Sequence, residues 1–307
     1  MAHGHADEHG PARPGDARAL RLVLGLTAAL AIAELVGGLV TGSLALLADA
    51  GHMVSDVGSL GLALFALWLA QRPPTARMSF GFRRAEILAA FVNGVALVAI
   101  AIWIFVEAGQ RFSDPPDVEA GATLAIALAG LAVNVIGLVI LTRSGGRSLN
   151  MRAATLHVFA DLLGSAGVIV AAVVILTTGW LYADPLVSVL IGVLILASSW
   201  RVLRESLGVL LEAAPEGIDV DEVGRRMADV EGVSEVHDLH IWTITSGFPA
   251  LSAHVLVPEG EDCHARRREL SEMLQREFGI AHTTLQVEHG EGGGAPVRVS
   301  LSEKRSS

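Results

Sequence analysis

Six long, predominantly apolar runs dominate the first two thirds of the chain. A helix needs about 20 apolar residues to cross the hydrocarbon core of a bilayer, and only helices and closed barrels satisfy their backbone hydrogen bonds there. The composition agrees, with 52% hydrophobic and only 18% charged residues. We therefore expect an α-helical polytopic membrane protein. Its expected transmembrane helices are residues 18–40, 44–70, 84–109, 118–142, 152–178 and 183–203.

Positive charge is unevenly distributed between the connections of these helices. Arginines gather in 71–84 and 143–152, whereas 41–43 and 179–183 contain no Lys or Arg. The positive-inside rule then places both termini in the cytoplasm. The hydrophilic N-terminus lacks the short apolar region of a cleavable signal peptide. We expect a multi-pass protein of the cell membrane, inner or plasma.

The composition changes near residue 208, where amphipathic and alternating segments replace the apolar runs. Their order is helix, strand, strand, helix, strand, which predicts a small α+β sandwich. Asp262 is the expected N-cap of the second helix and Gly279 its C-terminal stop. The expected parts are a flexible His-containing tail, a membrane domain, a soluble domain and a disordered tail, at 1–17, 18–207, 208–290 and 291–307.

Two copies of the spacing His-x-x-x-Asp lie inside the apolar runs: His52 with Asp56, and His157 with Asp161. Residues four apart share one face of a helix. Ionisable groups at membrane depth are costly and indicate a functional site. Two such faces supply four nitrogen and oxygen ligands, a set that suits tetrahedral Zn²⁺. Because ligands must lose protons to bind metal, the four groups predict exchange of one metal ion for protons.

The surroundings of these pairs leave two interpretations open. Gly58-Ser59 follows one pair and Gly164-Ser165 the other, on helices expected to run in opposite directions. Inverted repeats would produce this arrangement, and so would coincidence among small residues that allow close helix packing. Asp49, one turn before His52, is expected to orient that imidazole from outside the ligand shell.

Other classes of protein fit the residues less well. Cys263 is the only cysteine, which excludes an intramolecular disulfide or a thiolate cluster. The chain has no H-E-x-x-H sequence, the signature of a zinc protease, so we expect no enzyme. No basic tract indicates nucleic acid, and we expect no organic cofactor. The alternative is a haem-binding membrane protein with His52 and His157 as axial ligands, but haem would not need the carboxylates.

Five stretches carry a family resemblance, and in chain order they are SLALLADAGHMVSD, SFGFRRAEILAAFVNG, NMRAATLHVFADLLGSAGVI, DPLVSVLIGVLIL and HDLHIW…LSAHV…HTTLQVE. Over about residues 18–289 the chain resembles the cation diffusion facilitator family, in its zinc/cadmium branch. The resemblance implies a homodimer of six-span protomers with cytoplasmic ferredoxin-like, metallochaperone-like domains. It also implies Zn²⁺/H⁺ antiport out of the cytoplasm by alternating access. The family's transport site matches His52, Asp56, His157 and Asp161. Family members with Asp at this position are associated with broader or different metals. His52 therefore implies zinc as the substrate, with cadmium as the second metal.

The resemblance also implies a regulatory zinc site in the soluble domain. The matching residues are His240, His254, His282 and Glu288, and His237 matches another. On a regular strand His237 and His240 point to opposite faces, so sharing one metal requires a bulge or a second protomer. The alternative is that these histidines are surface or packed residues. Trp242 is expected in the core.

Two further segments have weaker expectations. Relatives carry histidine ligands between the second and third spans, but here the sequence is MSFGFRRAE, so we expect no metal site there. Its arginines are expected to orient the protein and contact anionic lipid headgroups. His3, His5 and His9 either collect zinc loosely or lie in a solvated tail, since an unstructured tail loses entropy on binding.

Overall fold

The computed structural model describes residues 14–143, 149–290 and 299–300. Within that part, the side chains of a few helical residues, His157 among them, are outside the described residues. The contacts divide the chain into two units, residues 1–62 with 92–201 and residues 63–91 with 202–307. Each unit is described by itself.

Six helices are long and apolar enough to cross a membrane. They are α1 (Pro14–Thr41), α2 (Leu44–Ala70), α3 (Ala85–Ser113), α4 (Ala120–Arg143), α5 (Leu149–Thr178) and α6 (Ala183–Leu210). Most ends lie within about four residues of those expected, although α6 continues further than 203. The expected six-helix fold class is confirmed.

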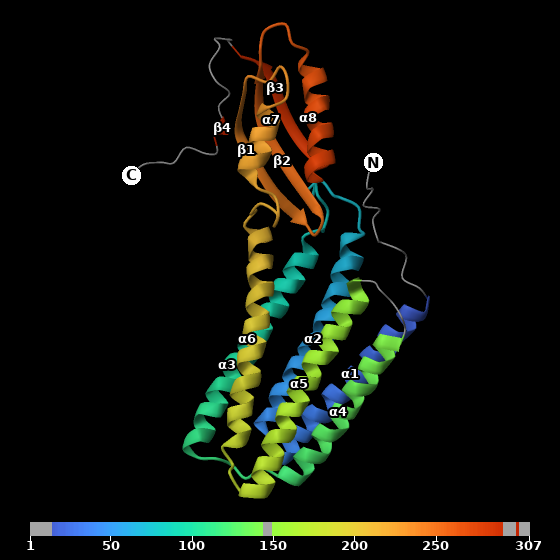
Figure 1. The fold of residues 1–307 in the computed structure, drawn as a ribbon, viewed down its shortest axis with the longest axis vertical. Helices are drawn as coiled ribbons and strands as arrows, with labels where there is room; N and C mark the ends of the chain where they lie inside the picture. Colours follow the sequence, from blue (N-terminus) through green and yellow to red (C-terminus); the bar gives the residue numbers. More distant parts are fainter. Residues whose placement is uncertain (1–13, 144–148, 291–298, 301–307) are drawn as a thin grey trace, which may run out of the picture. The chain divides into compact units, whose positions relative to one another are not determined.

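Small residues set the packing of α4 in the first unit. Helices α1, α4 and α5 lie side by side (Figure 1), and α4 contacts both of the others. The buried residues of α4 recur at helical spacing and are mostly small: Ala120, Thr123, Ala127, Gly130, Asn134, Gly137 and Leu141. Small side chains let helix backbones approach closely, so this stripe allows α1 and α5 to pack on α4.

Asp184, in the first turn of α6, accepts hydrogen bonds from the start of another helix. Its carboxylate accepts hydrogen bonds from Ser43 Oγ at 2.6 Å and from the backbone N–H of Leu44 at 2.8 Å. These are donors at the N-terminus of α2, where a negative charge is favourable. Arg111 Nη1 lies 3.5 Å from the same carboxylate. The buried group therefore joins the starts of α2 and α6 and the end of α3.

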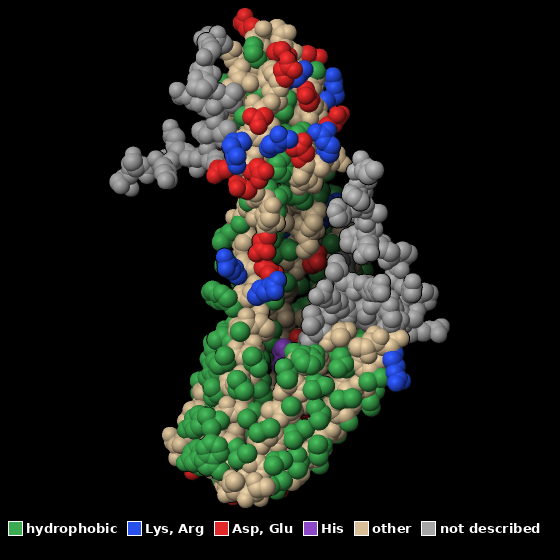
Figure 2. Space-filling view, viewed as in Figure 1, with side chains coloured by type: hydrophobic (Ala, Val, Ile, Leu, Met, Phe, Trp, Pro, Cys, Tyr) green, Lys and Arg blue, Asp and Glu red, His purple; other side chains and the backbone are tan. Residues whose placement is uncertain are grey.

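Large apolar side chains remain exposed along these helices. Leu39 is 68% exposed, Val40 72% and Trp200 67%. Figure 2 shows hydrophobic side chains covering the helices of the face in view. An apolar surface of this extent fits a helix bundle in contact with lipid rather than water.

The second unit contains the expected soluble fold. Its elements are α7 (Val220–Ala228), β1 (Glu235–Thr245), β2 (Phe248–Val257), α8 (Cys263–Phe278), β3 (His282–His289) and β4 (Val299–Ser300). The sheet order is β3-β2-β1-β4. Strands β1 and β2 are antiparallel, and β2 and β3 are parallel. The order helix, strand, strand, helix, strand is thus found, and β4 adds a short strand in the tail where no structure was expected.

The core of this unit lies between the sheet and the two helices. Alternate residues of β1 and β2, such as Val236 and Val255, are buried with Met227 of α7 and Leu274 of α8. Both expected ends of α8 are present. Asp262 accepts hydrogen bonds from the backbone N–H groups of its first turn, and Gly279 adopts φ 70° after its last turn.

Candidate metal centres

His52, Asp56 and Asp161 form one cluster in the first unit. Their candidate ligand atoms all lie within 4.8 Å of one another. His52 Nε2 lies 3.5 Å from Asp56 Oδ2 and 3.9 Å from Asp161 Oδ1. Two ligands of a tetrahedral zinc ion stand about 3.3 Å apart. The three groups therefore need only small movements to hold one ion.

The ligands come from two helices and differ in burial. His52 and Asp56 lie one turn apart on α2 and are each 22% exposed. Asp161, on α5, is 2% exposed. The fourth predicted ligand, His157, belongs to α5 one turn before Asp161, but its side chain lies outside the described residues. The expected pairing of α2 with α5 is present in the structure.

Asp49 lies beside this cluster and joins α2 to α5. Its Oδ2 accepts a hydrogen bond of 3.4 Å from Ser165 Oγ, which in turn accepts one of 3.2 Å from Asn134 Nδ2. A Cβ on Gly164 would lie 2.6 Å from Asp49 Oδ1. Glycine at 164 therefore gives the carboxylate its space. Orientation of the His52 ring by Asp49 stays a prediction.

The two Gly-Ser pairs play different parts. Gly164 packs on Asp49, and Ser165 donates to it. At Gly58 a Cβ would meet nothing within 4 Å, and Ser59 Oγ donates to the backbone oxygen of Asp56. Close packing against Asp49 explains the glycine at position 164, so inverted repeats are not needed to account for it.

A β-bulge in β1 changes the expectation for the soluble domain. His237 pairs with His254 and His240 with Ser252, so β1 has one residue more than β2 between these positions. Asp238 sits in the bulge with φ 52°. Val236, Leu239 and Ile241 point into the core. The extra residue in the bulge shifts the alternation of side chains along β1. His237 and His240 therefore lie on the same open face of the sheet.

Two imidazoles contact one carboxylate on this face, and a third lies beside one of them. Asp238 Oδ1 lies 2.9 Å from His240 Nε2, and Asp238 Oδ2 lies 4.0 Å from His254 Nε2. The rings of His237 and His254 have centroids 5.3 Å apart. Imidazole and carboxylate are both zinc ligands, so these side chains are candidates for a second metal site, although among the described residues only His52, Asp56 and Asp161 bring three ligand atoms within 4.8 Å of one another.

The other two predicted ligands lie elsewhere on the sheet. His282 is opposite Ala250, whereas Gln286 is opposite His254, which separates the two histidines by about 13 Å along the strand. The His282 ring packs against Phe80 and Phe248. Glu288 is nearer, opposite Leu256, and accepts a hydrogen bond from Gln286. The structure does not bring His282 to the histidine cluster.

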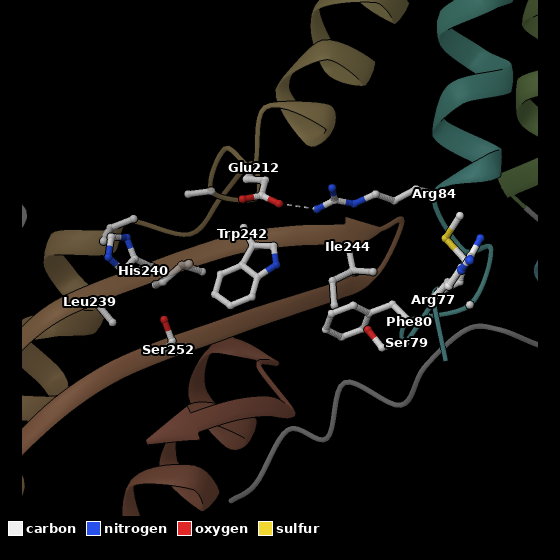
Figure 3. Close-up of a pocket in the computed structure, with 15 residues that line it drawn as sticks. Arg77, Ser79, Phe80, Arg84, Glu212, Leu239, His240, Trp242, Ile244 and Ser252 are labelled. Atoms are coloured by element: carbon white, nitrogen blue, oxygen red, sulfur yellow. Dashed lines mark hydrogen bonds and ion pairs between the residues drawn. The ribbon is translucent and has the colours of Figure 1, made fainter. Parts of the chain in front are cut away.

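Trp242 is not part of the core, contrary to expectation. The bulge places it on the same face as His240, where it is half-buried and lines a cavity of about 850 Å³ (Figure 3). At the rim of this cavity Arg84 forms a 3.0 Å ion pair with Glu212. Arg83 lies over the Phe248 ring at 4.6 Å. These two arginines therefore contact protein groups, in addition to any role in orientation.

Sequence reasoning missed three residues near these centres. Asp238 stands between the histidines, and the signal was its place in HDLH. His289 Nε2 lies 3.5 Å from Cys263 Sγ, a contact that no sequence spacing indicated. The third is Glu34, whose burial beside the first centre has no sequence signal. His3, His5 and His9 lie outside the described residues.

The fold and the first centre together define a polytopic membrane protein with a cluster of candidate cation ligands on two of its helices. Two family models cover most of the chain. The cation efflux transmembrane domain matches residues 20–211, and the cytoplasmic domain of cation efflux proteins matches 215–290. The chain belongs to this cation efflux family, which confirms the resemblance to cation diffusion facilitators.

Three curated relatives illustrate the similarity. The zinc transporter ZitB of Escherichia coli K12 is 44% identical and aligns over 94% of this chain and 92% of its own length. The metal cation efflux system protein CzcD of Cupriavidus metallidurans is 42% identical, over 94% and 90%. The cadmium, cobalt and zinc/H⁺-K⁺ antiporter of Bacillus subtilis is 44% identical, over 84% of each.

Proposed function

We propose that the chain exports Zn²⁺, and also Cd²⁺, from the cytoplasm in exchange for protons. The ion binds tetrahedrally between His52, Asp56, His157 and Asp161. The observation that carries this proposal is the approach of His52, Asp56 and Asp161 to within 4.8 Å of one another on two apolar helices. Similarity to a zinc transporter and to a cadmium, cobalt and zinc/H⁺-K⁺ antiporter supports these substrates.

The chemistry of the cluster accounts for coupling. A divalent ion offsets the negative charges of Asp56 and Asp161, and protons on the same ligands offset them when the ion leaves. Neither the metal-bound state nor the protonated state leaves a bare carboxylate in an apolar setting. The site can therefore exchange metal for protons while the transporter opens to the other side of the membrane. Alternating access then requires the ligand pairs on α2 and α5 to face one side of the bilayer and then the other.

The soluble domain is proposed to bind regulatory zinc and to mediate a homodimer. His237, His240 and His254 around Asp238 form the proposed ligand cluster, with Glu288 on the same sheet. The match of 215–290 to the family's cytoplasmic domain supports this assignment. Both termini then lie in the cytoplasm, in line with the arginine-rich connections, and the membrane is the cell membrane.

Axial haem ligation by His52 and His157 is the alternative. Two carboxylates within 4 Å of His52 Nε2 favour a divalent cation instead. A Soret band in the spectrum of the purified protein would decide for haem. No group in the described clusters calls for an organic cofactor, and the proposed function is transport rather than catalysis.

Zinc uptake into inside-out vesicles, with and without a pH gradient, tests the proposal. We expect the gradient to accelerate uptake by the unchanged chain, and we expect Asp161→Ala to abolish uptake because the buried ligand is lost. Asp114→Ala, an exposed aspartate outside the cluster, is the matched control and should transport normally. Near-normal flux through well-folded Asp161→Ala would refute the site.

A further inference from the structure

Glu34 is a fully buried carboxyl on α1 that the proposed metal site does not use. It is 0% exposed. Among the described residues, no hydrogen-bond donor reaches Oε1 or Oε2. A Cβ on Gly130 would lie 2.6 Å from Glu34 Oε1, so the glycine of α4 makes the space that the carboxyl occupies. The helix packing thus accommodates this group without neutralising it.

Among the residues that the structure describes, the charged groups that act on Glu34 are acidic. Asp49 of α2 and Asp161 of α5 are its electrostatic neighbours among the described residues. The α4 helix has no titratable side chain before Arg143 at its end. A Cβ on Gly130 would also lie 3.6 Å from Ser165 Oγ, which donates a hydrogen bond to Asp49. Glu34 therefore borders the polar link between α2 and α5, which lies beside the proposed metal site.

Burial without a partner limits the charge state of such a group. A carboxylate out of water costs several kcal/mol or more unless a cation or a proton neutralises it. Two further acidic groups nearby increase that cost while the metal site is empty. A divalent ion between Asp56 and Asp161 offsets the charges of both carboxylates, so less negative charge acts on Glu34 when the metal site is filled.

We propose that Glu34 is a counter-ion site of this transporter, holding one proton while the metal site is empty and releasing it when the metal site fills. The inference rests on the proposed function, since it takes the metal site as given. It places part of the proton exchange on a carboxyl that does not ligate the metal.

The exchange balances simply. On metal binding the O–H bond of Glu34 breaks, the electron pair stays on the carboxylate oxygen, and the proton passes to water. When the metal leaves, a proton from water binds the same oxygen and restores the neutral acid. No oxidant, reductant or further reactant takes part.

Proton release on zinc binding measures this directly in the detergent-solubilised full chain. The protons released by Asp161→Asn are subtracted from those released by the unchanged chain. This subtraction removes the cytoplasmic contribution and leaves the release from the membrane site. We expect Glu34→Gln to bind zinc but to release about one proton fewer per zinc. Glu34→Asp, which keeps a titratable group, should release more than Glu34→Gln. Equal release from Glu34→Gln and the unchanged chain would overturn the inference.

A matched control separates Glu34 from membrane glutamates in general. Glu107 lies on α3 and forms a 3.0 Å ion pair with Arg111. Because it already has a partner, Glu107→Gln should release as many protons as the unchanged chain. Failure of the proposed function looks different, since Asp161→Asn would then bind zinc and release protons like the unchanged chain.

A second measurement needs no substitution. With glutamate carboxyls isotope-labelled, infrared difference spectra of zinc binding report glutamate apart from the aspartate ligands. We expect zinc to remove a protonated glutamate carboxyl band. Zinc binding without that loss would overturn the inference, even if Glu34→Gln did not fold.

Discussion

At the scale of residues, position within the packed helices decides what each acidic group does. Asp161 and Asp184 are equally buried, at 2% and 1% exposed. Asp184 meets hydroxyl and backbone donors and an arginine, which is a structural role. Asp161 meets an imidazole, which suits a shared cation. The sequence predicted Asp161 through its spacing from His157, but the role of Asp184 depends on α2, about 140 residues earlier in the chain.

Replacing His52 tests the contribution of the imidazole to metal choice. His52→Asp exchanges a nitrogen ligand for an oxygen ligand, which favours harder cations. We expect the preference for zinc over manganese, measured as the ratio of transport rates in proteoliposomes, to fall by about tenfold. His264→Asp, an exposed position on α8, should leave the ratio unchanged. An unaltered ratio in His52→Asp would remove this role of the imidazole.

At the scale of elements, helices were more predictable than strands. Apolar length alone predicted α1 to α6, because the hydrocarbon core requires long helices whatever their contacts. The bulge in β1 was not predictable, since the pattern of HDLHIW permits a regular strand. Pairing with β2 decided its position, and the bulge brought His237 and His240 to one face and turned Trp242 out of the core.

The N-cap of α8 has a pH dependence that belongs to this scale. Hydrogen bonds from the backbone N–H groups of Ala265 and His264 hold the pKa of Asp262 below its usual value. A lowered folded-state pKa stabilises the fold above the unfolded pKa, and the contribution is lost as pH falls through the folded pKa. Acid should therefore weaken the first turn of α8.

Asp262→Asn tests this pH dependence, because the amide oxygen can accept the same bonds but does not titrate. We expect the first-turn amides of α8 to lose less protection in acid than in the unchanged chain, measured by hydrogen exchange at matched pH. Asp219→Asn, at the corresponding cap of α7, should leave α8 unaffected. Equal acid sensitivity of α8 in Asp262→Asn and the unchanged chain would contradict the prediction.

At the scale of the whole molecule, the chain combines six long apolar helices with a C-terminal α+β domain. The candidate centres differ accordingly. The first lies on apolar helices and includes a buried ligand, whereas the second lies on an open sheet face with His240 59% exposed. The buried site is proposed to exchange its ion for protons, which suits transport, and the exposed histidine cluster is proposed to sense cytoplasmic zinc reversibly.

Replacing His240 and His254 by alanine tests that division of roles. In an Asp161→Ala background, which removes the membrane site, we expect cytoplasmic zinc affinity to fall by about 100-fold or more, measured by calorimetry. His282→Ala should keep the affinity, because its ring packs between Phe80 and Phe248. With the membrane site intact, the double variant should still transport some zinc. Complete loss of transport by an intact dimer would mean that the domain does more than regulate.

The sequence by itself determined the membrane helices, the order of elements in the soluble unit and the paired His-x-x-x-Asp spacing. These follow from local rules, because hydropathy and helical periodicity do not depend on distant contacts. Only the tertiary structure decided which side chains meet. The association of α2 with α5 brought Asp161 to His52, and Gly130 made space for Glu34. Strand pairing placed Asp238 beside His240 and His254. Such contacts join residues far apart in the chain, and packing rather than spacing selects them.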